Sequence, residues 1–389
     1  MSVSKRLTVE RFSPKFDPLL IAQLFRRLED HQATDLSDET WDRGTPSGWL
    51  DQLVADWRAF DVPALERSIS EFDHFQVQVD STSIHVVVEL GSGSSPLPII
   101  LTHGWPGSFM EYLKLIAMLA HPENFGGDPD ESFTVVVPSL PGFGFSGPPR
   151  EGGFTYGEVA ELWNEVMTSG LGFDSYVAHG SDLGAGVTAR LARAHPFQVA
   201  AILLATPGMP IPPKPWSPGM TEHFREVEVW TSEEGGYMHV QSTKPSTIGA
   251  ALADSPVGLA SWIGEKAMAW SDTDEYGNCT FDRELLLSTL TLYWATRTGA
   301  SSLLPYWRYR HTPNSALKAD DVGPTPVAVS LFGGERVPFP KPPRELAARY
   351  FNLSSWIEYD SGGHFPAISD PSLLAKSLRQ AFRHFRTSK

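Results

Sequence analysis

The hydrophobic pattern predicts helices at the beginning of the chain and strands after them. Apolar residues recur at helical spacing over residues 18–35 and again over residues 47–60, so both segments are predicted to be amphipathic helices. Further along, the period shortens to two. Residues 76–79 and 84–88 alternate like the two arms of a β-hairpin, with residues 80–83 as the turn.

Short apolar runs bounded by Gly and Pro follow, and helical stretches separate them. Such runs are typical of strands that are buried on both faces of a sheet. They cover residues 98–102, 133–137, 175–178 and 199–204. This alternation of strands and helices predicts an α/β fold with a doubly wound, mostly parallel sheet.

A helical insertion interrupts the alternation. It begins after the proline-rich stretch 210–218, and one more strand is predicted at residues 327–331. An insertion at this point would form a lid over the carboxyl ends of the strands, where open α/β sheets place their sites. We therefore expect four segments, namely an N-terminal segment 1–90, a first core part 91–215, a helical lid 216–320 and a second core part 321–389.

Composition and charge narrow the classes of function. The chain has 389 residues, of which 41% are apolar, so it can bury a sizeable core. The 31 Lys and Arg against 46 Asp and Glu leave a net charge of −15, which argues against binding to nucleic acid or to an anionic membrane. The single cysteine, Cys279, fits a reducing compartment. Because the chain starts without an apolar signal region and contains no apolar run approaching ~18 residues, we expect a cytoplasmic protein without a membrane anchor.

Two motifs resemble ligand sites but lack essential parts. Residues 142–147 match G-x-G-x-x-G, yet two prolines follow at 148–149, so a turn is expected where a dinucleotide needs a helix. Residues 272–274 resemble the start of a calcium loop, but Arg283 stands where the closing Glu is needed. We therefore expect neither a cofactor nor a metal.

The candidate chemistry begins at a sharp turn between a buried strand and a helix. Asp182 occupies the tip of this turn, with Gly180 and Gly184 two residues to either side. Small neighbours of this kind let a nucleophile elbow expose one strained side chain. The alternative is an ordinary strand–helix turn in which Asp182 caps the helix. The backbone N–H groups of Leu183 and Trp105 are candidate donors to an oxyanion.

A histidine and a carboxylate follow Asp182 in the order nucleophile, acid, base. His364 comes after a pair of glycines that follow a strand-like run. Glu335 follows the strand at 327–332 through Gly333 and Gly334, in the loop where an orienting carboxylate belongs. Asp360 is the second candidate for this role, and the choice between Glu335 and Asp360 stays open.

An aspartate at the elbow predicts displacement at a saturated carbon. A serine alkoxide that attacked such a carbon would leave an ether, which water does not readily cleave. A carboxylate leaves an ester, and water activated by His364 can then attack the ester carbonyl. Epoxides and alkyl halides are the main substrates of this kind.

The handling of the leaving group favours epoxides. The side chain of Leu183, directly after the candidate nucleophile, cannot donate a hydrogen bond to a halide. The predicted lid supplies two phenols, Tyr237 and Tyr306, that stay protonated at neutral pH and can donate to an epoxide oxygen. A haloalkane dehalogenase and a ligand-binding homologue without chemistry are the alternatives.

Seven short segments also point to a known family. They are 72–75 (FDHF), 103–108 (HGWPGS), 138–146 (PSLPGFGFS), 180–184 (GSDLG), 236–241 (GYMHVQ), 254–259 (DSPVGL) and 362–365 (GGHF). In this order and over nearly the whole chain, they resemble the microsomal-type epoxide hydrolases of the α/β-hydrolase superfamily. They also resemble, less specifically, soluble bacterial members from enediyne antibiotic pathways.

The resemblance implies a role for each candidate residue. Asp182 matches the nucleophile, His364 the base, and Tyr237 and Tyr306 the two lid acids. Residues 1–90 look like the family's N-terminal meander, which wraps the core and lid. The chain departs from the family at Leu183, where a Trp is common, and in the spacing between Glu335 and the histidine. The membrane anchor of some relatives is not expected here.

We therefore expect a cofactor-independent enzyme that converts an apolar or aromatic epoxide to a vicinal diol through an ester on Asp182. Its expected partners are the small epoxide and water, with no nucleic acid and no membrane; the N-terminal segment could also support a homodimer. The sequence does not specify the physiological epoxide, its handedness or the ring carbon that is attacked.

Overall fold

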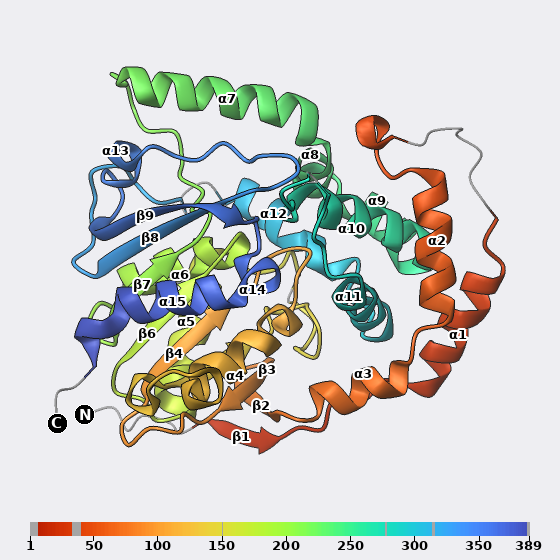
Figure 1. The fold of residues 1–389 in the computed structure, drawn as a ribbon, viewed down its shortest axis with the longest axis horizontal. Coiled ribbons are helices and arrows are strands. Elements are labelled where there is room, and N and C mark those ends of the chain that lie inside the picture. Colours follow the sequence, from red (N-terminus) through yellow and green to blue (C-terminus); the bar gives the residue numbers. More distant parts are fainter. Residues whose placement is uncertain (1–6, 33–39, 150, 277, 313–315, 387–389) are drawn as a thin grey trace.

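The computed structural model describes residues 7–32, 40–149, 151–276, 278–312 and 316–386, drawn in Figure 1. The described residues form a nine-stranded sheet with the strand order β1-β2-β3-β5-β4-β6-β7-β8-β9. The strands are β1 (Thr8–Arg11), β2 (Asp73–Val79), β3 (Thr82–Glu89), β4 (Leu97–Thr102), β5 (Phe133–Pro138), β6 (Tyr176–Gly180), β7 (Val199–Leu204), β8 (Pro326–Gly333) and β9 (Asn352–Gly362).

The sheet changes direction at β5. The pairs β1/β2, β2/β3 and β3/β5 are antiparallel, whereas every pair from β5 to β9 is parallel. Parallel neighbours need a crossover connection, which is usually helical. The helices that follow the core strands are α4 (Leu113–Ala120), α5 (Tyr156–Glu165), α6 (Leu183–Ala194), α13 (Arg344–Ala347), α14 (Pro366–Ser369) and α15 (Pro371–Phe382).

Both faces of the parallel sheet are buried. In β4, Ile99 and Leu101 pack into one apolar cluster with residues of α4 and α15, and Ile100 packs into a second cluster with residues of α5 and α6. Successive side chains of a strand point to opposite faces, so a strand with apolar residues throughout fills both clusters. This burial explains the uninterrupted apolar runs of the core strands.

The lid is inserted between β7 and β8. It comprises α7 (Pro218–Glu234), α8 (Gly236–Thr243), α9 (Pro245–Asp254), α10 (Pro256–Trp270), α11 (Arg283–Ala295) and α12 (Leu304–Arg310). The N-terminal helices are α1 (Pro18–Glu29), α2 (Ser47–Arg58) and α3 (Val62–Ile69), and Figure 1 shows α1 and α2 beside α10 and α11. A buried hydrogen bond of 2.9 Å from Trp57 Nε1 to Thr291 Oγ1 joins α2 to α11.

The predicted fold class is confirmed, with local corrections. The turn predicted at 80–83 is shorter, because Asp80 adopts a φ of 49° that suits a two-residue hairpin turn, and β3 already begins at Thr82. The first predicted helix ends at Glu29; residues 33–35 of that prediction lie outside the described residues. Strand β1 was not predicted at all, since its four residues (TVER) carry little apolar signal.

Candidate active site

A strained turn carries Asp182 to the carboxyl end of the sheet. Asp182 lies between β6 and α6 with φ 51° and ψ −124°, a left-handed conformation that residues other than glycine rarely adopt. The neighbouring glycines leave room for the bend. A Cβ on Gly184 would lie 2.0 Å from the carbonyl oxygen of Thr102, and one on Gly180 would lie 2.2 Å from that of Gly184. The local structure is therefore the elbow that the sequence predicts.

Two loops that are distant in sequence meet the Asp182 carboxylate. Oδ1 accepts a hydrogen bond of 2.8 Å from the backbone N–H of Trp105, and Oδ2 lies 3.3 Å from Nε2 of His364. The backbone N–H of Asp182 donates to Thr206 Oγ1 at 3.2 Å. The side chains of Asp182 and His364 are only 14% and 7% exposed, so this contact is largely shielded from water.

Backbone donors converge beside the same carboxylate. Trp105 follows β4, and its N–H already points at Asp182. Leu183 is the first residue of α6, and the first N–H groups of a helix have no partner within it. The Trp105 N–H therefore contacts the carboxylate directly, and the oxyanion role of the Trp105 and Leu183 N–H groups stays a prediction.

Two lid tyrosines stand over the core residues. Tyr237 belongs to α8 and Tyr306 to α12, and their ring centroids are 6.0 Å apart. The indole of Trp105 stacks parallel to Tyr237 at 5.4 Å and meets Tyr306 edge-on at 5.9 Å. Burial, together with the charge of Asp182, raises the pKa of both phenols, so both are hydrogen-bond donors at neutral pH. The buried hydroxyl of Tyr306 makes no hydrogen bond of normal geometry among the described residues, but it lies close enough to the Tyr237 hydroxyl to affect the pKa of both phenols.

The predicted orienting acid lies near the histidine without bonding to it. Glu335 follows β8 and is buried, which raises the pKa of its carboxyl, while the nearby His364 acts in the opposite direction. The described residues provide no hydrogen-bond partner for Nδ1 of His364. Asp360, the competing candidate, is exposed on β9. Of the two carboxylates, Glu335 is thus the buried one that interacts with His364.

Several neighbours of the site were missed by the sequence reasoning. The ring of Trp270 lies 5.0 Å from that of His364 and 5.4 Å from that of Tyr237. Asp272, in the segment that resembles a calcium loop, accepts a hydrogen bond of 2.8 Å from the N–H of Gly362 and so ties the lid to the histidine loop. Nothing in the local pattern of either residue indicates these contacts, which depend on how the lid folds back.

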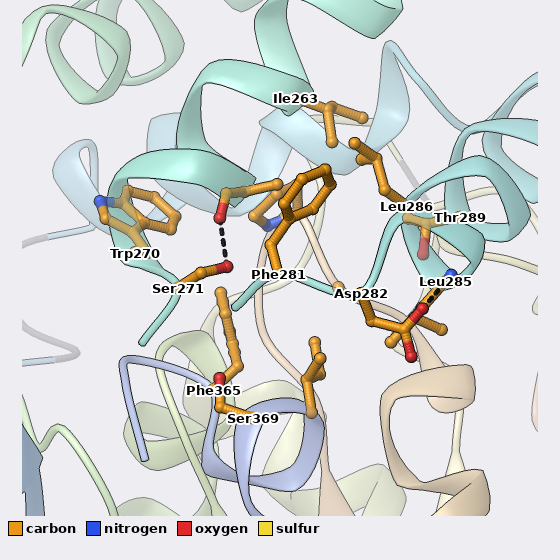
Figure 2. Close-up of a pocket in the computed structure, with 14 residues that line it drawn as sticks. Ile263, Trp270, Ser271, Phe281, Asp282, Leu285, Leu286, Thr289, Phe365 and Ser369 are labelled. Carbon is orange, nitrogen blue, oxygen red and sulfur yellow. Dashed lines mark hydrogen bonds between the residues drawn. The ribbon is translucent and has the colours of Figure 1, made fainter. Parts of the chain in front are cut away.

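A mostly apolar pocket of about 60 Å³ adjoins the site between the lid and the core. Figure 2 shows Ile263, Leu286 and Phe281 on the lid side and Phe365 on the core side. Pro106 also lines it, next to Trp105, and Phe365 is next to His364. A second, smaller pocket is lined by Leu183 and other mostly apolar residues. The surroundings of the site therefore suit an uncharged, apolar molecule.

Among the described residues, no group of three or more His, Cys, Asp or Glu side chains is arranged to hold a metal ion. In the same part of the chain, no helix is both long enough and apolar enough to cross a membrane.

Models of two protein families match the chain. The model described as the epoxide hydrolase N terminus covers residues 9–112, and the model of the alpha/beta hydrolase fold covers residues 98–257. Together they span the N-terminal segment, the elbow and the beginning of the lid.

Curated relatives and solved structures agree with these families. The chain is 39% identical to a protein from Stigmatella aurantiaca that is named as an epoxide hydrolase, over 90% of this chain and 78% of the relative. It is 30% identical to epoxide hydrolase 1 of Sus scrofa, over 92% of this chain and 85% of that relative. The structure of the Aspergillus niger epoxide hydrolase matches with a TM-score of 0.82 and 26% identity, over 99% of this chain and 98% of that structure. The juvenile hormone epoxide hydrolase of Bombyx mori, at 24% identity and a TM-score of 0.85, shares the fold over 99% of this chain and 96% of that structure.

Proposed function

This chain belongs to the epoxide hydrolase family, and from that premise we propose that it hydrolyses an apolar or aromatic epoxide through a covalent ester on Asp182. The observation that carries the proposal is the strained Asp182 carboxylate, held by the Trp105 N–H and lying 3.3 Å from His364 under two protonated phenols. Each of these groups matches one requirement of the two-step reaction.

In the first step, the carboxylate attacks a ring carbon from behind. Because Oδ1 already accepts the N–H of Trp105, Oδ2 is the oxygen available to form the new bond. The ring C–O bond breaks, and its electron pair moves to the epoxide oxygen. Tyr237 and Tyr306 donate hydrogen bonds to that oxygen and stabilise the charge that develops on it.

In the second step, water cleaves the ester at the carbonyl carbon of Asp182. His364 removes a proton from the attacking water through Nε2. The negative charge develops on Oδ1, which is already held by the Trp105 N–H and lies beside the N terminus of α6, where Leu183 offers the second N–H. Collapse of this intermediate breaks the bond between the Asp182 carbonyl carbon and the diol oxygen, which takes the proton from His364. The second proton of the water passes to the oxygen freed in the first step, so the diol leaves neutral and the carboxylate is restored.

Glu335 is the proposed partner of the histidine during this step. When His364 gains its proton, the positive ring favours the charged form of the Glu335 carboxyl, which burial otherwise disfavours. The exposed position of Asp360 gives it less influence, because water screens its charge.

The test is mass spectrometry of His364→Gln after incubation with styrene oxide. This variant should form the ester but not hydrolyse it, so the peptide that contains Asp182 should gain the mass of the substrate. Asp182→Ala under the same conditions should remain unmodified. The covalent mechanism is wrong if His364→Gln gains no mass there while the wild type still produces diol. Release of halide from alkyl halides, with no diol formed from any epoxide, would support a dehalogenase instead.

Cytoplasmic location, homodimer formation and a role in an enediyne antibiotic pathway stay predictions. The segment boundaries at residues 90, 215 and 320 are likewise proposals. Analytical ultracentrifugation distinguishes a monomer from a homodimer directly.

A further inference from the structure

A buried lysine lies beside one of the proposed lid acids. Lys266 belongs to α10, and its side chain is only 7% exposed. Its Nζ lies over the ring of Tyr237, 4.8 Å from the centroid, and 5.9 Å from the centroid of the Trp270 ring. A lysine is rarely buried to this extent unless it is paired. This ammonium therefore needs an explanation.

Its ion pair accounts for only part of the environment. Nζ lies 2.7 Å from Oε2 of Glu265, the preceding residue of α10, and the Glu265 side chain is 23% exposed. A lysine needed only for this pair could extend toward the solvent with its partner. Instead, the ammonium is in a site where the aromatic faces of Tyr237 and Trp270 are close to it, an arrangement that attracts a cation.

We propose that Lys266 is a positioning residue for ring opening, whose positive charge stabilises the negative charge that Tyr237 takes on as it donates to the epoxide oxygen. The inference rests on the proposed role of Tyr237. Lys266 neither gains nor loses a proton in this step. The electron pair of the broken C–O bond goes to the epoxide oxygen, and the Tyr237 hydrogen bond transfers part of that charge to the phenol.

The surroundings of Tyr237 show why a cation is needed there. Burial and the negative charge of Asp182 both raise the pKa of this phenol; Tyr156 and Glu265 act in the same direction, and only the Tyr306 hydroxyl acts against them. These influences keep Tyr237 protonated, but they also oppose any negative charge on its oxygen. A nearby ammonium that water screens poorly offsets them when that charge appears. Tyr306 has no such partner, since no cation–aromatic contact involves its ring among the described residues.

The experiment measures the two chemical steps separately in single-turnover reactions with styrene oxide, followed by tryptophan fluorescence. Lys266→Met removes the charge and keeps most of the apolar stem, so ring opening should slow about ten-fold while ester hydrolysis changes less than about two-fold. Lys266→Arg keeps the charge and should restore most of the rate. Glu265→Gln removes the counter-charge, so ring opening should be unchanged or faster.

The same measurements in a Tyr237→Phe background test whether the lysine acts through the tyrosine. With the phenol hydroxyl absent, adding Lys266→Met should slow ring opening by less than about two-fold. An equal loss in both backgrounds would overturn the inference, as would a Lys266→Met enzyme with normal ring opening. So would equal slowing of both chemical steps.

The outcomes also separate this inference from the proposed function. If Tyr237→Phe slows ring opening but Lys266→Met does not, only the role of the lysine fails. If Tyr237→Phe itself leaves ring opening unchanged, the proposed acid fails first, and the inference falls with it. If Lys266→Met does not fold, the Glu265→Gln variant provides the test. Slower ring opening in Glu265→Gln would mean that the ion pair is only structural and would overturn the inference.

Discussion

Asp182 combines a chemical group with a backbone conformation that opposes folding. Holding a non-glycine residue in such a region costs about 1–3 kcal/mol, which the surrounding structure must offset. Here the Trp105 N–H and the Thr206 hydroxyl bind the residue, and the neighbouring glycines let strand and helix approach closely. The strained backbone is therefore what places the Asp182 carboxylate at the carboxyl end of β6.

Adding a methyl group at Gly184 should disrupt this placement. In Gly184→Ala the new Cβ would lie 2.0 Å from the Thr102 carbonyl oxygen, so the elbow must shift. A displacement of about 1 Å costs on the order of 100-fold in rate, and kcat/KM for styrene oxide should fall by that amount. Gly157→Ala on α5 is the matched control, because its Cβ would meet only Thr155 Oγ1, at 4.0 Å. Full activity in Gly184→Ala would contradict the elbow geometry.

Tyr306→Phe should separate stability from activity. The hydroxyl that it removes is buried with no hydrogen bond of normal geometry among the described residues, and such a group is costly to bury. The free energy of unfolding should therefore stay the same or rise by about 1 kcal/mol, while ring opening slows about 100-fold. Urea unfolding and single-turnover kinetics measure the two effects. A variant that loses both stability and activity would indicate that the hydroxyl is structural.

At the scale of single residues, the local sequence predicts the position of residues that a turn places, and it misses residues that long-range packing places. Asp182 and His364 stand in glycine-containing loops after strands, and that pattern alone locates them at one edge of the sheet. Lys266 has no such signal. It is one charged residue of a lid helix, and only the folded lid brings it to Tyr237.

At the scale of elements, a chain of buried side chains joins the β2–β3 hairpin to the core. His74 Nδ1 lies 2.8 Å from His85 Nε2, and His85 Nδ1 lies 2.9 Å from Ser139 Oγ, in the loop after β5. His74 Nε2 also contacts the Ile69 carbonyl oxygen at 2.6 Å, so this nitrogen carries the proton. With both rings neutral, His85 Nε2 donates to His74 Nδ1 and the Ser139 hydroxyl donates to His85 Nδ1. Protonating both rings would place two N–H donors against each other and break the chain.

Acid should therefore destabilise the hairpin. Burial lowers the pKa of His74 and lowers that of His85 well below its usual value. In the unfolded chain each histidine binds a proton below about pH 6.5. The stabilising contribution of the neutral rings is thus complete above that pH and is lost as the pH falls, by about 1.4 kcal/mol per pH unit for each group.

His85→Gln should make the stability less dependent on pH. The free energy of unfolding, measured by urea titration between pH 7 and pH 5, should fall less steeply with decreasing pH than in the wild type. The difference in slope should correspond to about one proton fewer taken up on unfolding. His239→Gln, at an exposed position of the lid, is the control and should keep the wild-type slope. An unchanged slope in His85→Gln would show that the ring is not held neutral.

The elements themselves were predictable where the apolar pattern is strong. Strands β4 to β8 are apolar because both of their faces are buried, and this leaves a clear signal in the sequence. Strand β1 is mostly exposed, so it has little apolar pattern, and it forms through pairing with β2, more than sixty residues away. Pairing over that distance has no local signature.

At the scale of the whole molecule, the N-terminal helices, the core and the lid share one apolar cluster. Leu24 and Leu53 from the N-terminal segment, Ile202 from the core and Leu259 from the lid all belong to it. Figure 1 shows that the N-terminal segment runs from the sheet to the lid along one edge of the molecule. The segments are continuous in space, so we expect them to unfold together although the sequence divides them.

Trp57 and Thr291 offer a test of this cooperativity. Trp57→Phe removes the buried hydrogen bond between α2 and α11 and leaves the Thr291 hydroxyl short of its donor, which should cost about 1–3 kcal/mol. In scanning calorimetry, the wild type should unfold in one transition, and the variant should show that same transition shifted down by a few degrees. If the segments were independent, a second transition would appear and only one of the two would shift. The double variant Trp57→Phe with Thr291→Val should lose less than the sum of the single losses, because both remove the same bond and neither polar group is then left without its partner.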